Sequence, residues 1–171
     1  MSDLHGGYED VKRGLRTWLR GAEKVVILGV GSPLRRDDHI GVEVVRDLRD
    51  KVPEEVHLIE CETVPENFIE PIVSLKASHL LIVDAALLNR TAGSVMLVGP
   101  DKIGGIAVST HALPLSILCD YISRETGAKC ALLAIQPKDT GFGEDLTDEL
   151  KEALGRVLSL LVDALSKPQG H

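Results

Sequence analysis

Aromatic side chains are scarce in this sequence, and their scarcity restricts the kind of core it can build. Only 3% of the 171 residues are aromatic, although 44% are hydrophobic. The core must therefore consist mainly of Val, Ile, Leu and Ala, a composition typical of a parallel sheet covered by helices on both faces. The hydrophobic content argues against a disordered chain, and the length corresponds to one ordinary domain.

Paired cysteines, basic clusters and long apolar runs are also missing. Cys61, Cys119 and Cys130 form no C-x-x-C pair and are odd in number, which argues against a disulfide framework or a zinc knuckle. A formal net charge of −7 without a basic cluster makes nucleic acid and anionic membranes poor partners. No apolar run approaches the roughly 20 residues of a membrane span, and residues 1–21 lack the apolar segment of a signal peptide. We therefore expect a cytoplasmic protein, and we expect it to be a monomer.

Hydrophobic periodicity predicts strands that alternate with helices along the chain. The expected strands span residues 24–30, 56–61, 79–84, 94–98 and 130–136, and the expected helices span residues 8–20, 39–51, 65–75, 114–126 and 146–165. This order predicts an α/β sandwich with a mostly parallel sheet, in a single domain over residues 1–171 with a loose tail from about residue 166. The connections around the fourth strand are too short for helical crossovers, so we expect that strand to run antiparallel.

Polar residues follow the predicted strands at one edge of the sheet. Asp38 lies in the loop after the first strand, Asp84 ends the third, and His111 follows the fourth. Because ligands of open α/β sheets bind outside the carboxyl ends of the strands, these three side chains are candidates for one site at an exposed edge. Two carboxylates and an imidazole suit a borderline divalent metal ion, and they lack the thiolates of a structural zinc site.

Each of these residues also has an ordinary structural explanation. Asp84 can cap the next segment or hold a turn, and His111 can be a helix-entry residue before Ala-Leu-Pro. The pair Asp37-Asp38 precedes a predicted helix, where carboxylates interact favourably with the helix dipole. We expect one of these two acids to have that role and the other to be available for chemistry.

Other chemistries find less support in the sequence. Gly29-Val-Gly31 is like the start of a dinucleotide-binding fingerprint, but Leu34 stands where the third glycine is needed. The acid pair that follows would also repel a pyrophosphate at the helix N-terminus. A G-x-S-x-G nucleophile elbow is absent, and Cys61 has no assigned histidine partner. The residues alone thus indicate an α/β domain with an acidic, metal-capable edge.

Several blocks together resemble the hydrogenase maturation protease family. Residues 29–41, Gly-Val-Gly-Ser-Pro-Leu-Arg-Arg-Asp-Asp-His-Ile-Gly, are similar to the family signature G-x-G-N-x-x-x-x-D-(D/E)-x-x-G. Later family blocks correspond, in the same order, to Val64-Pro-Glu-Asn-Phe68, Leu81-Ile-Val-Asp-Ala85, Ser109-Thr-His-Ala-Leu-Pro-Leu115 and Ala134-Ile-Gln-Pro137. P-E-N and T-H-x-x-P-L are most similar to the branch that serves hydrogenase 3 and its archaeal counterparts. The resemblance covers residues 25–165, almost the whole chain.

The resemblance implies a fold, an activity and a set of site residues. The family fold is a three-layer sandwich, in which a twisted five-stranded, mostly parallel sheet lies between helices on both faces. Its members are endopeptidases, classed as aspartic-type, that remove the C-terminal extension of a [NiFe]-hydrogenase large-subunit precursor after nickel insertion. The family's metal-contacting positions correspond to Asp38, Asp84 and His111, of which Asp38 and Asp84 are the candidate catalytic acids. Nickel would arrive on the substrate, so no tightly held metal is expected in the free enzyme.

Two alternatives remain beside this interpretation. A non-catalytic nickel-binding or metallochaperone-like module would use the same three side chains without cleaving a peptide bond. The only evidence for the second alternative, a nucleotide-binding regulator, is the pair Gly29 and Gly31. Incubation with a precursor subunit separates the first alternative from a protease, because only a protease shortens the precursor.

The chain departs from the family pattern at two turns. Arg36 and His39 stand where the family often has glycine, before and after the acid pair. Glu60-Cys61-Glu62 replaces a glycine-rich turn after the second strand. Because glycine permits backbone conformations that other residues rarely adopt, we expect these turns to differ locally. Glu62 can also add a carboxylate to the edge.

Overall fold

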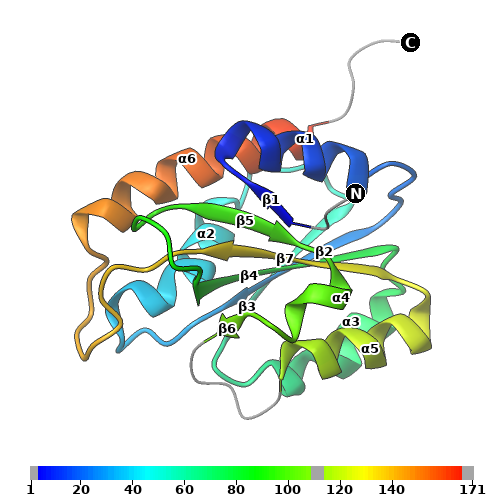
Figure 1. The fold of residues 1–171 in the computed structure, drawn as a ribbon. Helices are drawn as coiled ribbons and strands as arrows, with labels where there is room; N and C mark the ends of the chain where they lie inside the picture. The colour runs from blue at the N-terminus through cyan, green and yellow to red at the C-terminus, as the bar shows by residue number, and fades with distance from the viewer. Residues whose placement is uncertain (1–3, 109–113, 167–171) are drawn as a thin grey trace.

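One mixed sheet forms the centre of the protein, with helices on both of its faces (Figure 1). The computed structural model describes residues 4–108 and 114–166. The strands are β1 Leu4–Gly6, β2 Val25–Val30, β3 Val56–Glu62, β4 His79–Leu87, β5 Val95–Val98, β6 Ala107–Val108 and β7 Lys129–Ile135. The helices are α1 Tyr8–Trp18, α2 Ile40–Asp47, α3 Ile69–Leu75, α4 Pro100–Ile103, α5 Leu115–Thr126 and α6 Asp148–Leu165, with 3₁₀ turns η1 Arg36–His39 and η2 Pro65–Phe68.

The order of strands across the sheet is β1-β5-β7-β4-β2-β3, and β6 pairs with the end of β4. β3, β2, β4 and β7 run parallel, whereas β5 lies antiparallel to β7. The predicted α/β sandwich with five strands in a mostly parallel sheet is therefore confirmed, including the direction of β5. The short strands β1 and β6 were not predicted, because two or three residues carry no periodicity and depend on ladders to β5 and β4.

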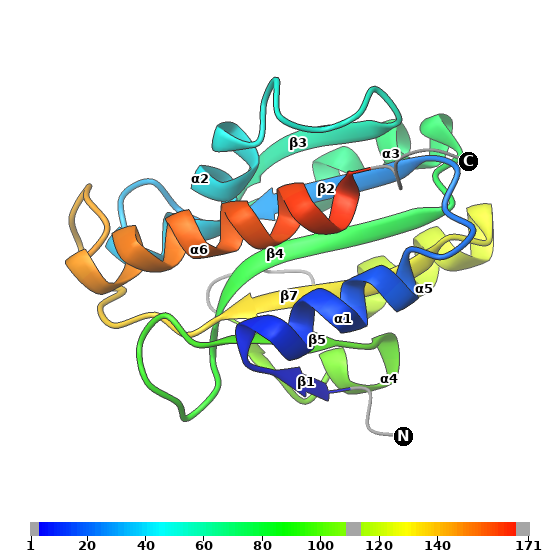
Figure 2. The ribbon, with the colours of Figure 1, turned by 90° about the horizontal axis from the view of Figure 1, so that it is seen from above.

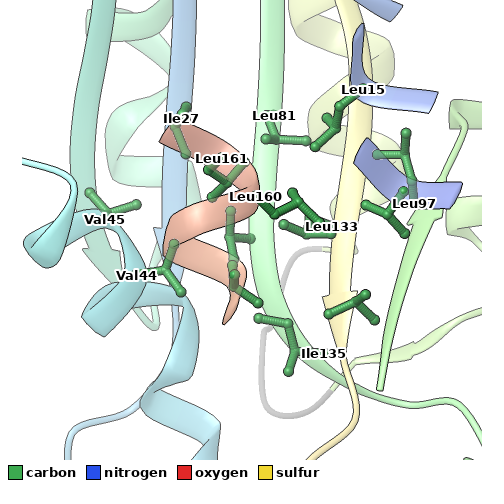
Figure 3. Close-up of a cluster of buried hydrophobic side chains, with 14 of the residues drawn as sticks. Leu15, Ile27, Val44, Val45, Leu81, Leu97, Leu133, Ile135, Leu160 and Leu161 are labelled. Carbon is green, nitrogen blue, oxygen red and sulfur yellow. The ribbon is translucent and has the colours of Figure 1, made fainter. Parts of the chain in front are cut away.

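Alternating side chains of the strands fill two separate cores. In β4, Leu81 and Val83 face one side of the sheet, and Leu80 and Ile82 face the other. Helices α1, α2 and α6 cover the first face, and α3, α4 and α5 cover the second (Figures 1 and 2). Figure 3 shows the first core, where aliphatic side chains of the strands lie together with those of α1, α2 and α6. Burial of each such side chain contributes roughly 1.5–3 kcal/mol, so two filled cores fix the sheet that carries the site.

β4 continues to Leu87, beyond its predicted end at Asp84. Asp84 pairs with Ala134 of β7, and Ala86 pairs with Val108 of β6, so neighbouring strands keep the chain extended. Apolar periodicity missed this continuation because a buried acid interrupts the pattern. Asp84 therefore lies inside a strand, and the explanation that it caps the next segment or holds a turn is wrong.

Helices lie near both ends of the described part of the chain. The expected helix over residues 8–20 is α1, which ends at Trp18. Helix α6 ends at Leu165, and residues 167–171 of the expected tail lie outside the described residues. Within residues 4–108 and 114–166, no helix has both the length and the apolar character needed to cross a membrane.

The path of the chain makes the carboxyl ends of β2 and β4 a topological switch point. From β2 the chain passes through α2 to β3 on one side, whereas from β4 it continues to the side of β5 and β7. The connections that follow these two neighbouring strands therefore diverge, and ligands of open α/β sheets bind where this happens.

Candidate active site at the carboxyl ends of β2 and β4

The structure brings two of the three predicted site residues to the switch point. Asp38 lies in η1, in the connection that follows β2, and Asp84 lies near the carboxyl end of β4. Both carboxylates are 0% exposed, so the expectation of an exposed edge is wrong for them. Charged side chains are rarely buried completely unless a local environment or a function retains them. The Ser32 N–H donates to Asp38 Oδ2 at 2.9 Å and fixes the orientation of that carboxylate.

The third predicted residue, His111, lies in the segment 109–113, outside the described residues. Within residues 4–108 and 114–166, no group of three His, Cys, Asp or Glu side chains is arranged to hold a metal ion. Asp38 and Asp84 supply oxygen ligands only, which on their own suit hard cations rather than nickel. The assignment of His111 as the nitrogen ligand therefore remains a prediction.

Glycines of the predicted signature hold η1 and α2 close to the ends of these strands. A Cβ atom on Gly31 would lie 1.9 Å from the carbonyl oxygen of Asp38, and one on Gly41 would lie 2.1 Å from that of Val83. Side chains at these positions would push the Asp38 loop away from β2 and β4. A Cβ atom on Gly29 would likewise lie 2.4 Å from the carbonyl oxygen of Gly41, so close packing explains Gly29 and Gly31, the two residues on which the nucleotide-binding alternative rested.

The other acid of the pair, Asp37, has a structural role. Its carboxylate is 0% exposed and joins the Asp38 loop to residues 138–147. Asp37 Oδ2 accepts the N–H groups of Lys138 and Asp139, each at 2.9 Å, and Oδ1 accepts the N–H of Thr147 at 2.8 Å. The Thr147 hydroxyl donates to the same carboxylate. One acid is therefore structural, as expected, but its partners are a distant loop rather than the N-terminus of the next helix.

One residue at each of the two turns that depart from the family's glycine pattern has a glycine-like backbone. Arg36 has φ 44° and Glu62 has φ 59°, both in the left-handed region that costs roughly 1–2 kcal/mol for a residue with a side chain. The Glu62 carbonyl accepts the Gly31 N–H at 2.7 Å, which ties the end of β3 to the Asp38 loop. Arg36 and Glu62 thus keep left-handed conformations where the sequence predicted a local difference, whereas His39 has an ordinary φ of −80°. Glu62 is exposed, so it does not join the buried acid pair.

Two further residues, Cys61 and Glu66, were not assigned from the sequence. Cys61 is buried, and this burial raises the pKa of its thiol to about 12, with a smaller contribution from the negative charges of Asp84 and Glu66. A thiol that stays protonated at neutral pH is a poor nucleophile, which agrees with the sequence analysis. Glu66 has a buried Oε2 atom that accepts no hydrogen bond from the residues described. The only sequence feature that pointed to Glu66 was the P-E-N block, which contains it.

The fold and the buried acids define an α/β domain with an acidic site at its topological switch point, and comparison with known proteins identifies its family. The model of the hydrogenase maturation protease family matches residues 42–164. A candidate hydrogenase maturation protease of Methanocaldococcus jannaschii is 32% identical over 92% of this chain and 97% of its own. The hydrogenase 3 maturation protease of Escherichia coli K12 is 31% identical over 80% of this chain and 87% of its own.

A solved structure supports the same assignment. The crystal structure of a [NiFe] hydrogenase maturation protease from Thermococcus kodakarensis KOD1 is similar with a TM-score of 0.81 and 34% sequence identity. The similarity covers 88% of this chain and 97% of that chain. The protein therefore belongs to the hydrogenase maturation protease family, as the sequence blocks indicated.

Proposed function

We propose that the protein is an endopeptidase that removes the C-terminal extension of a [NiFe]-hydrogenase large-subunit precursor after nickel insertion. The observation that carries this proposal is the pair of fully buried carboxylates, Asp38 and Asp84, at the switch point of the sheet. Membership of a family of hydrogenase maturation proteases supports the reaction class. The substrate is inferred from relatives that are named for hydrogenase maturation.

In the proposed reaction, the nickel belongs to the substrate and serves as the feature that the enzyme recognises. Asp38, Asp84 and His111 would offer two oxygen ligands and one nitrogen ligand to open positions on that nickel, a set that suits a borderline divalent ion. Binding through the metal would hold the scissile peptide next to the acids, which is a gain in proximity. Because both carboxylates are fully covered in the free protein, contact with a substrate requires a local opening at this edge.

Asp38 would act as the acid–base group in an aspartic-type hydrolysis. Its carboxylate would accept a proton from the attacking water and return it to the nitrogen of the leaving amine, so that the enzyme is regenerated. The hydrogen bond from the Ser32 N–H keeps the carboxylate oriented for this transfer. Burial strengthens the electrostatic interactions within the site, because the surrounding medium has a low dielectric constant.

The proposal is tested by incubating the protein with nickel-loaded and nickel-free precursor and following the precursor mass by mass spectrometry. We expect loss of the C-terminal extension from the nickel-loaded precursor only, since the nickel-free form lacks the recognised group. Cleavage of both forms at equal rates would contradict nickel recognition. Stable binding of the nickel-loaded precursor without any cleavage would instead support the non-catalytic nickel-binding module.

A further inference from the structure

Large apolar side chains are exposed on the same edge of the sheet as the buried acids. Within the part of the chain that the structure describes, six large hydrophobic side chains are exposed. Four of them follow the carboxyl ends of parallel strands: Leu34 after β2, Val64 after β3, Leu87 at the end of β4 and Phe142 after β7. Exposed apolar side chains gathered around a polar site are typical of a surface that binds another protein.

Phe142 is 85% exposed, yet the segment that carries it is firmly held. The Gly143 N–H donates to the Leu34 carbonyl at 2.9 Å, and the Gly143 carbonyl accepts the Arg36 N–H at 3.0 Å. Further N–H groups of the same segment donate to the carboxylate of Asp37. The exposure of the aromatic ring is therefore a property of an ordered surface, on which a partner can bury the ring with little loss of conformational entropy.

The same contacts place Phe142 beside the candidate active site. Asp38 donates its N–H to the carbonyl of Arg35 at 3.0 Å, and Arg35 forms a parallel bridge with Gly143. Arg35 Nε also donates to the Thr140 carbonyl at 3.1 Å. Figures 1 and 2 both show the connection between β7 and α6 alongside the connection between β2 and α2. A polypeptide that reaches Asp38 therefore lies next to this pair of connections.

We propose that Leu34 and Phe142 form a docking platform for an apolar segment of the hydrogenase precursor, next to the peptide bond that is cleaved. This inference rests on the proposed function, because it takes the precursor as the occupant. Leu34 is 50% exposed and belongs to the same loop as Asp38, so the platform is continuous with the site. Leu34 and Phe142 are both apolar, so the platform favours an apolar segment, and the charge of the neighbouring Arg36 is partly balanced by the Asp139 carboxylate at 3.6 Å.

The test measures the affinity of the nickel-loaded precursor for the immobilised protein and for its Phe142→Ser variant by surface plasmon resonance. We expect the dissociation constant of Phe142→Ser to rise about 10-fold or more, since aromatic anchors carry much of the binding energy of protein interfaces. Tyr121→Ser, which removes an exposed aromatic ring from α5, is the matched control and should bind like the wild type. Phe142→Leu should retain most of the affinity, because it keeps an apolar side chain.

Two outcomes would overturn the docking platform, whether or not the precursor is cleaved. Wild-type affinity in both Phe142→Ser and Leu34→Ser would show that the precursor does not bury these side chains. A lower thermal midpoint of Phe142→Ser would show that the ring stabilises the fold instead. If Phe142→Ser weakens binding while the wild type fails to cleave the precursor, the platform is supported and the proposed protease function fails.

Discussion

Asp38→Asn is expected to lower the rate of precursor processing by about 100-fold or more without unfolding the protein. The amide oxygen of asparagine can still accept the Ser32 N–H, so the local structure is retained. The neutral amide cannot accept the proton of a water molecule, and it is a weaker metal ligand than a carboxylate. Processing is measured as the rate at which the nickel-loaded precursor loses its extension, and folding is checked by circular dichroism.

Asp101→Asn is the matched control for this variant, because Asp101 is an exposed acid on α4. Helix α4 follows the end of β5, which runs antiparallel to β7, so it begins at the opposite edge of the sheet from the candidate site. It should process the precursor at the wild-type rate. His111→Ala is expected to show a loss similar to that of Asp38→Asn, as a nitrogen ligand would be removed. Wild-type processing by Asp38→Asn would contradict its role as the acid–base group.

Asp37→Ala is expected to lower the free energy of unfolding by about 3 kcal/mol or more, the largest stability effect in the site. The change removes a buried carboxylate that accepts three backbone N–H groups and the Thr147 hydroxyl. A buried donor left without an acceptor costs about 1–3 kcal/mol, although water can solvate part of a loosened loop. Urea denaturation, followed by circular dichroism, measures the difference.

Asp37→Asn provides the comparison, because its amide oxygen retains one acceptor while the charge is removed. We expect a smaller loss of stability than in Asp37→Ala. Processing should fall in both variants, since the Asp37 hydrogen bonds join the Asp38 loop to residues 138–147. If the free energy of unfolding of Asp37→Ala lies within about 1 kcal/mol of the wild-type value, the carboxylate does not hold these two segments together.

The fold was predictable from the sequence to the extent that local patterns determine it. Apolar runs such as Val25–Val30 in β2 and Leu80–Val83 in β4 identify buried strands, and short connections identify β5 as antiparallel. The additional strands β1 and β6 exist only through pairing with β5 and β4, so no local pattern marks them. The extension of β4 past Asp84 likewise depends on its neighbours in the sheet rather than on its own residues.

The candidate site was predictable in its position but not in its environment. Topology alone puts Asp38 and Asp84 at one edge, because the connections after β2 and β4 diverge there. Their complete burial is a property of the folded protein that no local pattern in the sequence marks. Asp37 illustrates the difficulty, since its hydrogen-bond partners Lys138 and Thr147 lie 101 and 110 residues further along the sequence. No local rule relates an acid to backbone groups at such a distance.

Nickel K-edge X-ray absorption of the precursor, alone and in complex with the protein, tests most directly whether the protein binds the nickel that its proposed substrate carries. If Asp38, Asp84 and His111 bind the metal, the complex should gain oxygen and nitrogen neighbours around nickel, and a complex with His111→Ala should lose the nitrogen contribution. A nickel spectrum that is identical in the free precursor and in a fully formed complex would contradict the claim.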